Sequence, residues 1–180
     1  DEGSGTVAYD SSGNGNDGNL INGPTWTTGK IGGALSFDGV NDYVDLDVGT
    51  KLSQKSLISV SLWIKPVEYK YAVLINQKKA NSFGWAFKWR VSNEKLYFKI
   101  YGQSESSSAH LTYPNNPQLN AWSHLIAVIG QNSHKIYLDS SINHEINNSL
   151  SFEASSGDVS VGSDKNLEYF NGLIDDVRIY

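Results

Sequence analysis

Short apolar segments that alternate with polar residues dominate the chain. Between residues 58 and 64 every second residue is aliphatic, which leaves Ser59, Ser61 and Trp63 on the opposite face of an extended strand. Residues 96–101 follow the same period of two. Clusters of Gly, Ser, Asn and Asp separate such segments at short intervals, and no segment keeps a helical apolar period over three turns. This pattern predicts an all-β fold, a two-sheet antiparallel β-sandwich.

Size and composition are those of a folded domain. The chain has 180 residues, of which 39% are hydrophobic, 12% aromatic and 18% charged, and these fractions exclude an intrinsically disordered chain. We expect one domain over residues 1–180, and the lack of an initiator methionine predicts a module excised from a larger protein. The absence of cysteine excludes a disulfide scaffold and a thiolate zinc site.

The charge distribution limits the possible partners. The formal net charge is −5, and the chain has no basic tract of the kind that contacts a phosphate backbone. No apolar run approaches the ~20 residues that a membrane span requires. We therefore expect neither nucleic-acid binding nor membrane insertion.

Several motifs occur in a fixed order along nearly the whole chain, at residues 10–18, 32–39, 42–46, 58–66, 122–128 and 170–180. Together they resemble the laminin-G-like jelly rolls of the concanavalin A-like lectin/glucanase superfamily. The resemblance implies two antiparallel sheets packed face to face, one of them with a shallow concave outer surface. It also implies a secreted or cell-surface protein, although the fold carries lectins, adhesion domains and glucanases alike.

The first of these motifs contains oxygen-bearing side chains at alternate positions. Asp10, Ser12 and Asn14 precede a glycine, as in the first half of an EF-hand calcium loop, but the twelfth position is Ile21 instead of a bidentate glutamate. The resemblance implies a structural calcium near the junction of the terminal strands, with Asp175 as a further ligand. An Asx-rich turn capped by its own side chains explains the same residues, and both interpretations stay open.

Residues 38–42 have the sequence Asp-Gly-Val-Asn-Asp, which predicts a hairpin turn. A contribution of Asp38 to the same calcium site is the minor interpretation of this segment.

A second set of residues forms a candidate ligand-binding face. Leu62, Phe98 and Ile100 take inward positions, and we expect Trp85, Phe87 and Trp89 to pack in the core. The side chains between them then point outward: Trp63, Lys88, Arg90, Tyr97, Lys99 and Tyr101. Aromatic rings stack on the apolar faces of sugars, while cations bind hydroxyls or carboxylates. With Lys65 as a fourth cation, this face favours a glycan that carries carboxylates or sulfates. The alternative is an ordinary solvated sheet face, with Trp63 covered by a loop.

Catalytic patterns are missing from the sequence. The glucanases of the superfamily carry Glu-x-Asp-x-x-Glu on one strand, and this chain contains no such string. We therefore expect no catalytic residues and a non-catalytic, lectin-like carbohydrate-binding module, with a structural calcium as its only cofactor. Its partners would be a glycan and the other domains of a parent protein. The alternatives are a protein–protein adhesion domain of the same fold and, least favoured, a glycoside hydrolase or lyase.

Overall fold

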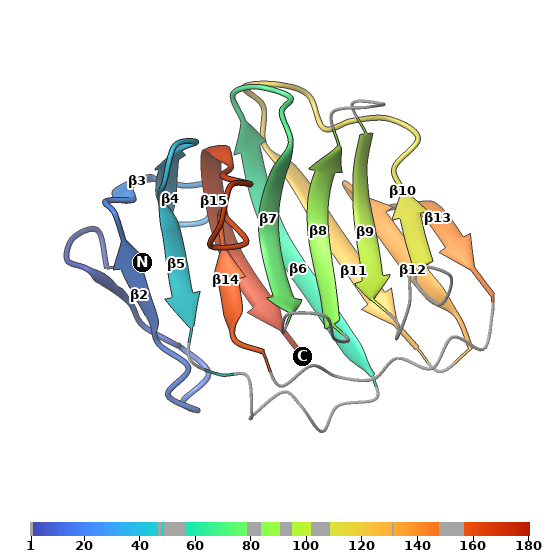
Figure 1. Ribbon diagram of the computed structural model, residues 1–180, viewed down its shortest axis with the longest axis horizontal. Helices are drawn as coiled ribbons and strands as arrows, with labels where there is room; N and C mark the ends of the chain where they lie inside the picture. Colours follow the sequence, from blue (N-terminus) through green and yellow to red (C-terminus); the bar gives the residue numbers. More distant parts are fainter. Residues whose placement is uncertain are drawn as a thin grey trace.

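The computed structural model describes residues 2–46, 48, 57–78, 84–90, 95–101, 109–130, 132–147 and 157–180, and these residues form a β-sandwich (Figure 1). One sheet has eight strands, in the spatial order β1 (Val7–Ala8), β2 (Gly18–Ile21), β5 (Tyr43–Leu46), β14 (Val159–Val161), β7 (Ala72–Lys78), β8 (Gly84–Arg90), β9 (Lys95–Tyr101) and β10 (Ala109–Thr112). The other has seven strands: β13 (Ser141–Ile146), β12 (His134–Leu138), β11 (Ser123–Ile129), β6 (Ile58–Pro66), β15 (Asn171–Ile179), β4 (Gly33–Asp38) and β3 (Thr25–Thr28).

The strand pairings confirm the predicted fold class. Every neighbouring pair of strands in both sheets is antiparallel. The described residues contain no helix, and so none that is long and apolar enough to cross a membrane.

Aromatic side chains from the eight-stranded sheet fill the centre of the sandwich. Trp85, Phe87 and Trp89 of β8 are 0%, 0% and 1% exposed, as the alternation predicts. Phe98 of β9 stacks on Trp85 with ring centroids 6.1 Å apart and meets Phe87 edge to face at 4.7 Å. The indole nitrogen of Trp85 donates to Gln77 Oε1 at 3.1 Å, so this polar atom is satisfied inside the core.

The turn at residues 38–42 joins the two sheets, so the predicted hairpin is wrong. A hairpin would pair β4 with β5, yet β4 pairs with β3 and β15, while β5 pairs with β2 and β14. Phe37 and Val44 both belong to the core, one from each sheet, and burying both requires the chain to cross between the sheets. The turn chemistry is nevertheless the expected one, because Asp38 Oδ1 accepts the amides of Val40 and Asn41 at 2.7 and 3.3 Å.

A buried aspartate on β15, the strand between β4 and β6, holds the turn that precedes β4. The carboxylate of Asp175, on β15, accepts the backbone amides of Lys30 and Ile31 at 2.7 and 2.8 Å, and Asp175 is 4% exposed. A Cβ at position 29 would lie 2.5 Å from Asp175 Oδ2, which explains the glycine there. Asp175 thus joins segments more than a hundred residues apart in sequence.

Replacing Asp175 by alanine should leave these two amides without an acceptor and destabilise the fold by about 2 kcal/mol. For a domain of this size the melting temperature should fall by roughly 4–8 °C, which differential scanning calorimetry can measure. Asp158 is exposed, so Asp158→Ala is the control and should change the melting temperature little. Equal melting temperatures for the two variants would contradict the capping role.

Candidate functional site

The outer face of β8 and β9 carries five of the six predicted ligand-binding residues. Lys88 lies directly opposite Tyr97 in the register of the two strands, and both point away from the aromatic core. Arg90, Lys99 and Tyr101 share this face by the same alternation. The inward and outward assignment of the two strands is thereby confirmed, while a role in ligand binding stays a prediction.

These side chains are less exposed than an open sheet face implies. Tyr97 is 5% exposed and Lys88 and Lys99 are each 8% exposed, whereas Arg90 is exposed. Neighbouring side chains contribute to this burial: Arg90 lies over the Tyr97 ring at 5.7 Å, and Lys99 lies over the Tyr101 ring at 4.7 Å. The outer face of β8 and β9 therefore carries closely packed cation–π pairs, in which a neighbouring cation partly covers each ring. We call these paired residues, Arg90 with Tyr97 and Lys99 with Tyr101, the cation–π lattice.

Trp63 does not belong to this face. It lies on β6 of the seven-stranded sheet, so its outward direction points to the opposite side of the sandwich. The ring of His124 stacks on it with centroids 4.7 Å apart and an interplanar angle of 14°. Lys30 Nζ also lies over the indole, 5.2 Å from the ring centroid. Trp63 is thus partly covered by neighbouring side chains, and the outward positions of β6 also place Lys65 on that sheet.

Two loop residues that sequence reasoning missed complete the candidate face. Glu168 forms an ion pair with Lys88, with Nζ and Oε2 2.5 Å apart and both side chains largely buried. Tyr71, which is 41% exposed, lies beside the pair, with Lys88 Nζ 5.5 Å from its ring centroid. Both residues precede strands in irregular segments, where no alternation indicates direction. We call Tyr71, Lys88 and Glu168 the Lys88 cluster.

Burial and charge inside the Lys88 cluster act against each other. Burial by itself lowers the pKa of Lys88, but the hydrogen bond and the negative charge of Glu168 outweigh it and hold this pKa above its ordinary value. Burial raises the pKa of Tyr71 to about 12; the positive charge of Lys88 opposes this rise and the Glu168 carboxylate adds to it. Lys88 is therefore charged and Tyr71 neutral at physiological pH.

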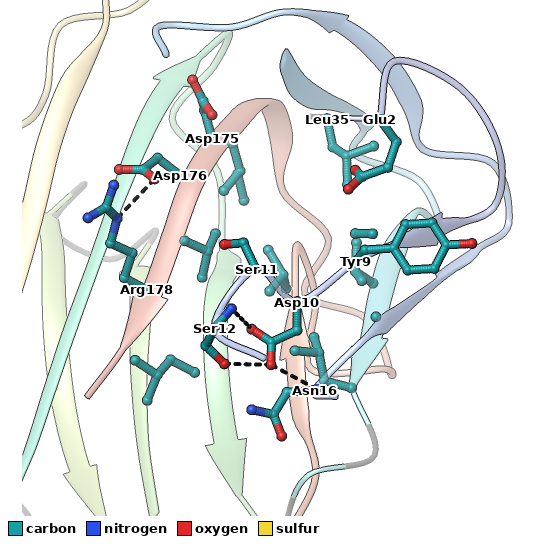
Figure 2. Close-up of a pocket in the computed structure, with 18 of the residues that line it drawn as sticks. Glu2, Tyr9, Asp10, Ser11, Ser12, Asn16, Leu35, Asp175, Asp176 and Arg178 are labelled. Atoms are coloured by element: carbon teal, nitrogen blue, oxygen red, sulfur yellow. Dashed lines mark hydrogen bonds and ion pairs between the residues drawn. The ribbon is translucent and has the colours of Figure 1, made fainter. Parts of the chain in front are cut away.

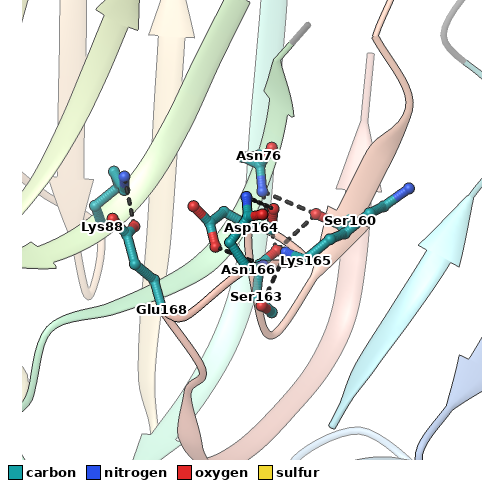
Figure 3. Close-up of polar contacts among 8 residues, drawn as sticks. All are labelled: Asn76, Lys88, Ser160, Ser163, Asp164, Lys165, Asn166 and Glu168. Carbon is teal, nitrogen blue, oxygen red and sulfur yellow. Dashed lines mark hydrogen bonds and ion pairs between the residues drawn. The ribbon is translucent and has the colours of Figure 1, made fainter. Parts of the chain in front are cut away.

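The loop of residues 162–170 fixes Glu168 in place (Figure 3). Its base is closed by the Phe170 amide, which donates to the Gly162 carbonyl at 2.8 Å. The Glu168 carbonyl accepts the Val73 amide on β7 at 3.0 Å, which attaches the loop to the sheet. On the other side Asn76 Nδ2 donates to the Ser163 carbonyl at 3.0 Å. The carboxylate thus belongs to a loop held at three points.

The predicted calcium ligands lie in part around a second feature, a pocket of about 1380 Å³ at the end of the sandwich (Figure 2). Asp10, Asn14 and Asp175 line this pocket, and Asp38 is not among its lining residues. Asp10 accepts hydrogen bonds from the Ser12 hydroxyl at 2.7 Å, the Ser12 amide at 2.9 Å and the Asn16 amide at 3.0 Å.

These hydrogen bonds determine the electrostatics of Asp10. Led by the Ser12 hydroxyl, they lower its pKa from 3.8 to about 2, so the negative charge is favoured in the folded loop. Because the folded-state pKa is depressed, the associated stability is present above pH 3.8 and is lost as the pH falls toward 2. The effect is small, since the loop is exposed to solvent.

The four predicted ligands do not fit one shared calcium site in this arrangement. The carboxylates of Asp10, Asp38 and Asp175 each accept amides of a different turn, so N–H groups occupy directions that a cation would need. Within the described ranges, no three His, Asp or Glu residues lie close enough together to hold a metal ion. Calcium binding stays a prediction, and at Asp10 the cation would share the carboxylate with the donors from Ser12 and Asn16.

Family comparison agrees with the architecture. Residues 38–180 match a laminin-G-type family described as the concanavalin A-like lectin/glucanases superfamily, and the chain belongs to this superfamily. The resemblance drawn from the ordered motifs is thereby confirmed. A search of curated proteins finds no match to the sequence.

Solved structures share the fold at low sequence identity. Domain 4 of AbnA, an extracellular family-43 arabinanase from Geobacillus stearothermophilus, was solved with arabinotriose; it has a TM-score of 0.76 and 22% identity, over 95% of this chain and 85% of that one. The carbohydrate-binding module CBM66 from Bacillus subtilis has a TM-score of 0.53 and 15% identity, over 90% and 94% of the two chains. Domains LG4-5 of the mouse laminin α1 chain give 0.63 and 14%, over 91% and 43%.

The burial of Tyr97 changes what its removal should do. Tyr97→Ala should destabilise the fold by about 2–4 kcal/mol, because it removes a large buried ring and exposes its neighbours. Arg90→Ala, at an exposed position, should stay within about 0.5 kcal/mol of the parent. Urea denaturation followed by tryptophan fluorescence can measure both. A Tyr97→Ala variant as stable as Arg90→Ala would show that the lattice is open rather than packed.

If calcium binds through Asp10, adding it at 100 times its dissociation constant should stabilise the fold by about 2.7 kcal/mol. Asp10→Asn should abolish that gain, because the amide lacks the charge that a hard cation requires. The measurement is the melting temperature in calcium and in chelator. Identical melting temperatures in the two buffers would count against a calcium site in the native fold.

Proposed function

We propose that the chain is a non-catalytic carbohydrate-binding module that holds a glycan on the outer face of its eight-stranded sheet. The observation that carries the proposal is the Lys88 cluster, in which a half-exposed tyrosine ring adjoins a charged, largely buried donor–acceptor pair. Sugars present apolar C–H faces and polar edges together, and a ring beside fixed polar groups suits both.

The neighbouring lattice extends this surface along β8 and β9. Arg90 is exposed next to Tyr97, and Lys99 and Tyr101 continue the same pairing toward the other end of β9. Of this row Arg90 is exposed, so a polysaccharide that lies on the Lys88 cluster can make a second, weak contact there. Pairing with tyrosines also holds the cations in fixed positions, which lowers the entropic cost of binding.

The comparisons support a glycan as the partner. The arabinanase domain was solved with arabinotriose, and CBM66 is itself a carbohydrate-binding module. The arabinanase is extracellular, which supports a secreted or cell-surface location for this chain. We propose a role without catalysis because the acidic residue of the Lys88 cluster is engaged in an ion pair, which suits binding better than proton transfer.

The proposal predicts that the purified chain binds at least one of five polysaccharides in affinity electrophoresis: linear arabinan, β-1,4-mannan, β-1,3-glucan, polygalacturonate and alginate. Tyr71→Ala should weaken that binding about three- to tenfold, because it removes the exposed ring of the cluster. The bound polysaccharide should release no new reducing ends on long incubation.

The control is Tyr9→Ala, at a 65% exposed tyrosine that lines the end pocket. It should leave binding unchanged. A loss with Tyr9→Ala but not with Tyr71→Ala would move the site to the end pocket. Binding to none of the five polysaccharides would contradict the proposed function.

A further inference from the structure

The end pocket lies against a part of β15 that has a neighbouring strand on one side only. On one side β4 pairs with β15 as far as Ile174, and on the other side β6 accompanies β15 as far as Ile179. Within the described ranges, no pairing on the β4 side extends past Ile174. The last residues of this interior strand therefore have an open edge, and those residues line the pocket.

The strand register shows which backbone groups face the open edge. Tyr180 and Ser59 of the neighbouring strand exchange both of their backbone hydrogen bonds, at 2.9 and 3.0 Å. Because N–H and C=O groups alternate in direction along a strand, those of Ile179, and of Val177 before it, point away from β6 toward the open edge. A ligand can reach this edge, since Val177 is 37% exposed and Tyr180 is 68% exposed.

The space beside the open edge is apolar. Ile179 packs against the core, and Val177, two residues earlier, shares its inner side and lines the pocket. An inward side chain on an interior strand is ordinarily buried, so the exposure of Val177 indicates a core that is incomplete at this end. Further apolar lining residues come from both sheets: Leu35, Phe37, Val44, Leu46, Val161 and Ile174.

An extended peptide segment meets both requirements of this pocket. Its backbone supplies donors and acceptors at the repeat of a strand, and its alternate side chains point to one side, where the space between the sheets is apolar. The mouth of the pocket adds a charge preference (Figure 2). Glu2 and Asp10 line it, and Arg178 is paired with Asp176, so the mouth is negative and favours basic residues in the ligand.

We propose that the end pocket is a docking site for one extended strand of a partner polypeptide, with apolar residues at alternate positions and basic residues at its ends. The strand pairs with the open edge at Val177 and Ile179 and extends the hydrogen bonding of the sheet there. Its apolar side chains enter the space between the two sheets. This site is separate from the glycan-binding face, which lies on the outer side of the eight-stranded sheet.

Amide hydrogen exchange, followed by NMR, tests the open edge. In the isolated chain the amides of Val177 and Ile179 should exchange at least about tenfold faster than that of Arg178, which is directed at β6. Adding the capped peptide Lys-Val-Thr-Val-Thr-Val-Lys should slow exchange at both positions by about tenfold or more. Amides at 177 and 179 that are as slow as that of Arg178 without peptide would show that the edge is closed and would overturn the proposal.

Fluorescence polarisation of the dye-labelled peptide tests the chemistry of the ligand. The peptide Lys-Val-Val-Val-Thr-Thr-Lys has the same composition without the alternation and should bind about tenfold more weakly. Replacing both lysines by glutamate should weaken binding about three- to tenfold, because the mouth is negative.

Val177→Asp should abolish binding of the alternating peptide, because it places a charge in the apolar space. The matched control is Val40→Asp, at a 69% exposed valine that is not among the lining residues, and it should leave the affinity unchanged. Melting temperatures of both variants establish that they are folded.

The remaining outcomes decide against the proposal. Equal binding of the alternating and the rearranged peptide, or binding that survives in a folded Val177→Asp variant, overturns it. Protection of Val177 and Ile179 that rises with protein concentration, together with dimers in sedimentation, would assign the edge to a second copy of the chain instead. Polysaccharides play no part in these measurements, so the failure of either proposal leaves the other standing.

Discussion

The pleat of β8 is the constraint on which the rest of the candidate site depends. Three large aromatic side chains of this strand must face the opposite sheet to form the core, and successive side chains on a strand alternate. Lys88, between two of them, is therefore forced onto the outer face. Because β8 lies between β7 and β9, neighbouring strands flank the lysine on both sides and reduce its access to water. Its charge requires a local counterion, and the loop before β15 provides it in Glu168.

Alternation in the sequence predicts which side of a strand a residue occupies, but it does not predict the sheet to which the strand belongs. Trp63 and Tyr97 are both outward, as expected, yet they lie on opposite sides of the sandwich because β6 and β9 are in different sheets. The turn at residues 38–42 shows the same limit. Asp and Gly satisfy the backbone of a tight turn whether it joins paired strands or crosses between sheets, so the local signal is the same for both.

For a related reason, the sequence pattern does not predict the direction of side chains in irregular segments. Glu168 and Tyr71 have no periodicity that fixes their direction, and their meeting with Lys88 depends on how two distant segments pack. The calcium motif is ambiguous for a different reason. Oxygen atoms at alternate positions are equally suited to a cation and to the amides of their own turn, and in the structure those of Asp10 face the amides of Ser12 and Asn16.

The position of β15 has a consequence for the way the chain folds. This strand lies between β6 and β4, so the seven-stranded sheet consists of two separate pieces until residues 171–179 insert between them. Nearly every pairing in that sheet that involves β15 is remote in sequence, which is characteristic of slow folding with a large loop-closure cost. During folding both pieces present unpaired edges until residues 171–179 are in place, and until then those edges are open to association with other chains. A chaperone that shields those edges therefore matters more for this fold than for one in which the strand that completes the sheet lies at its margin.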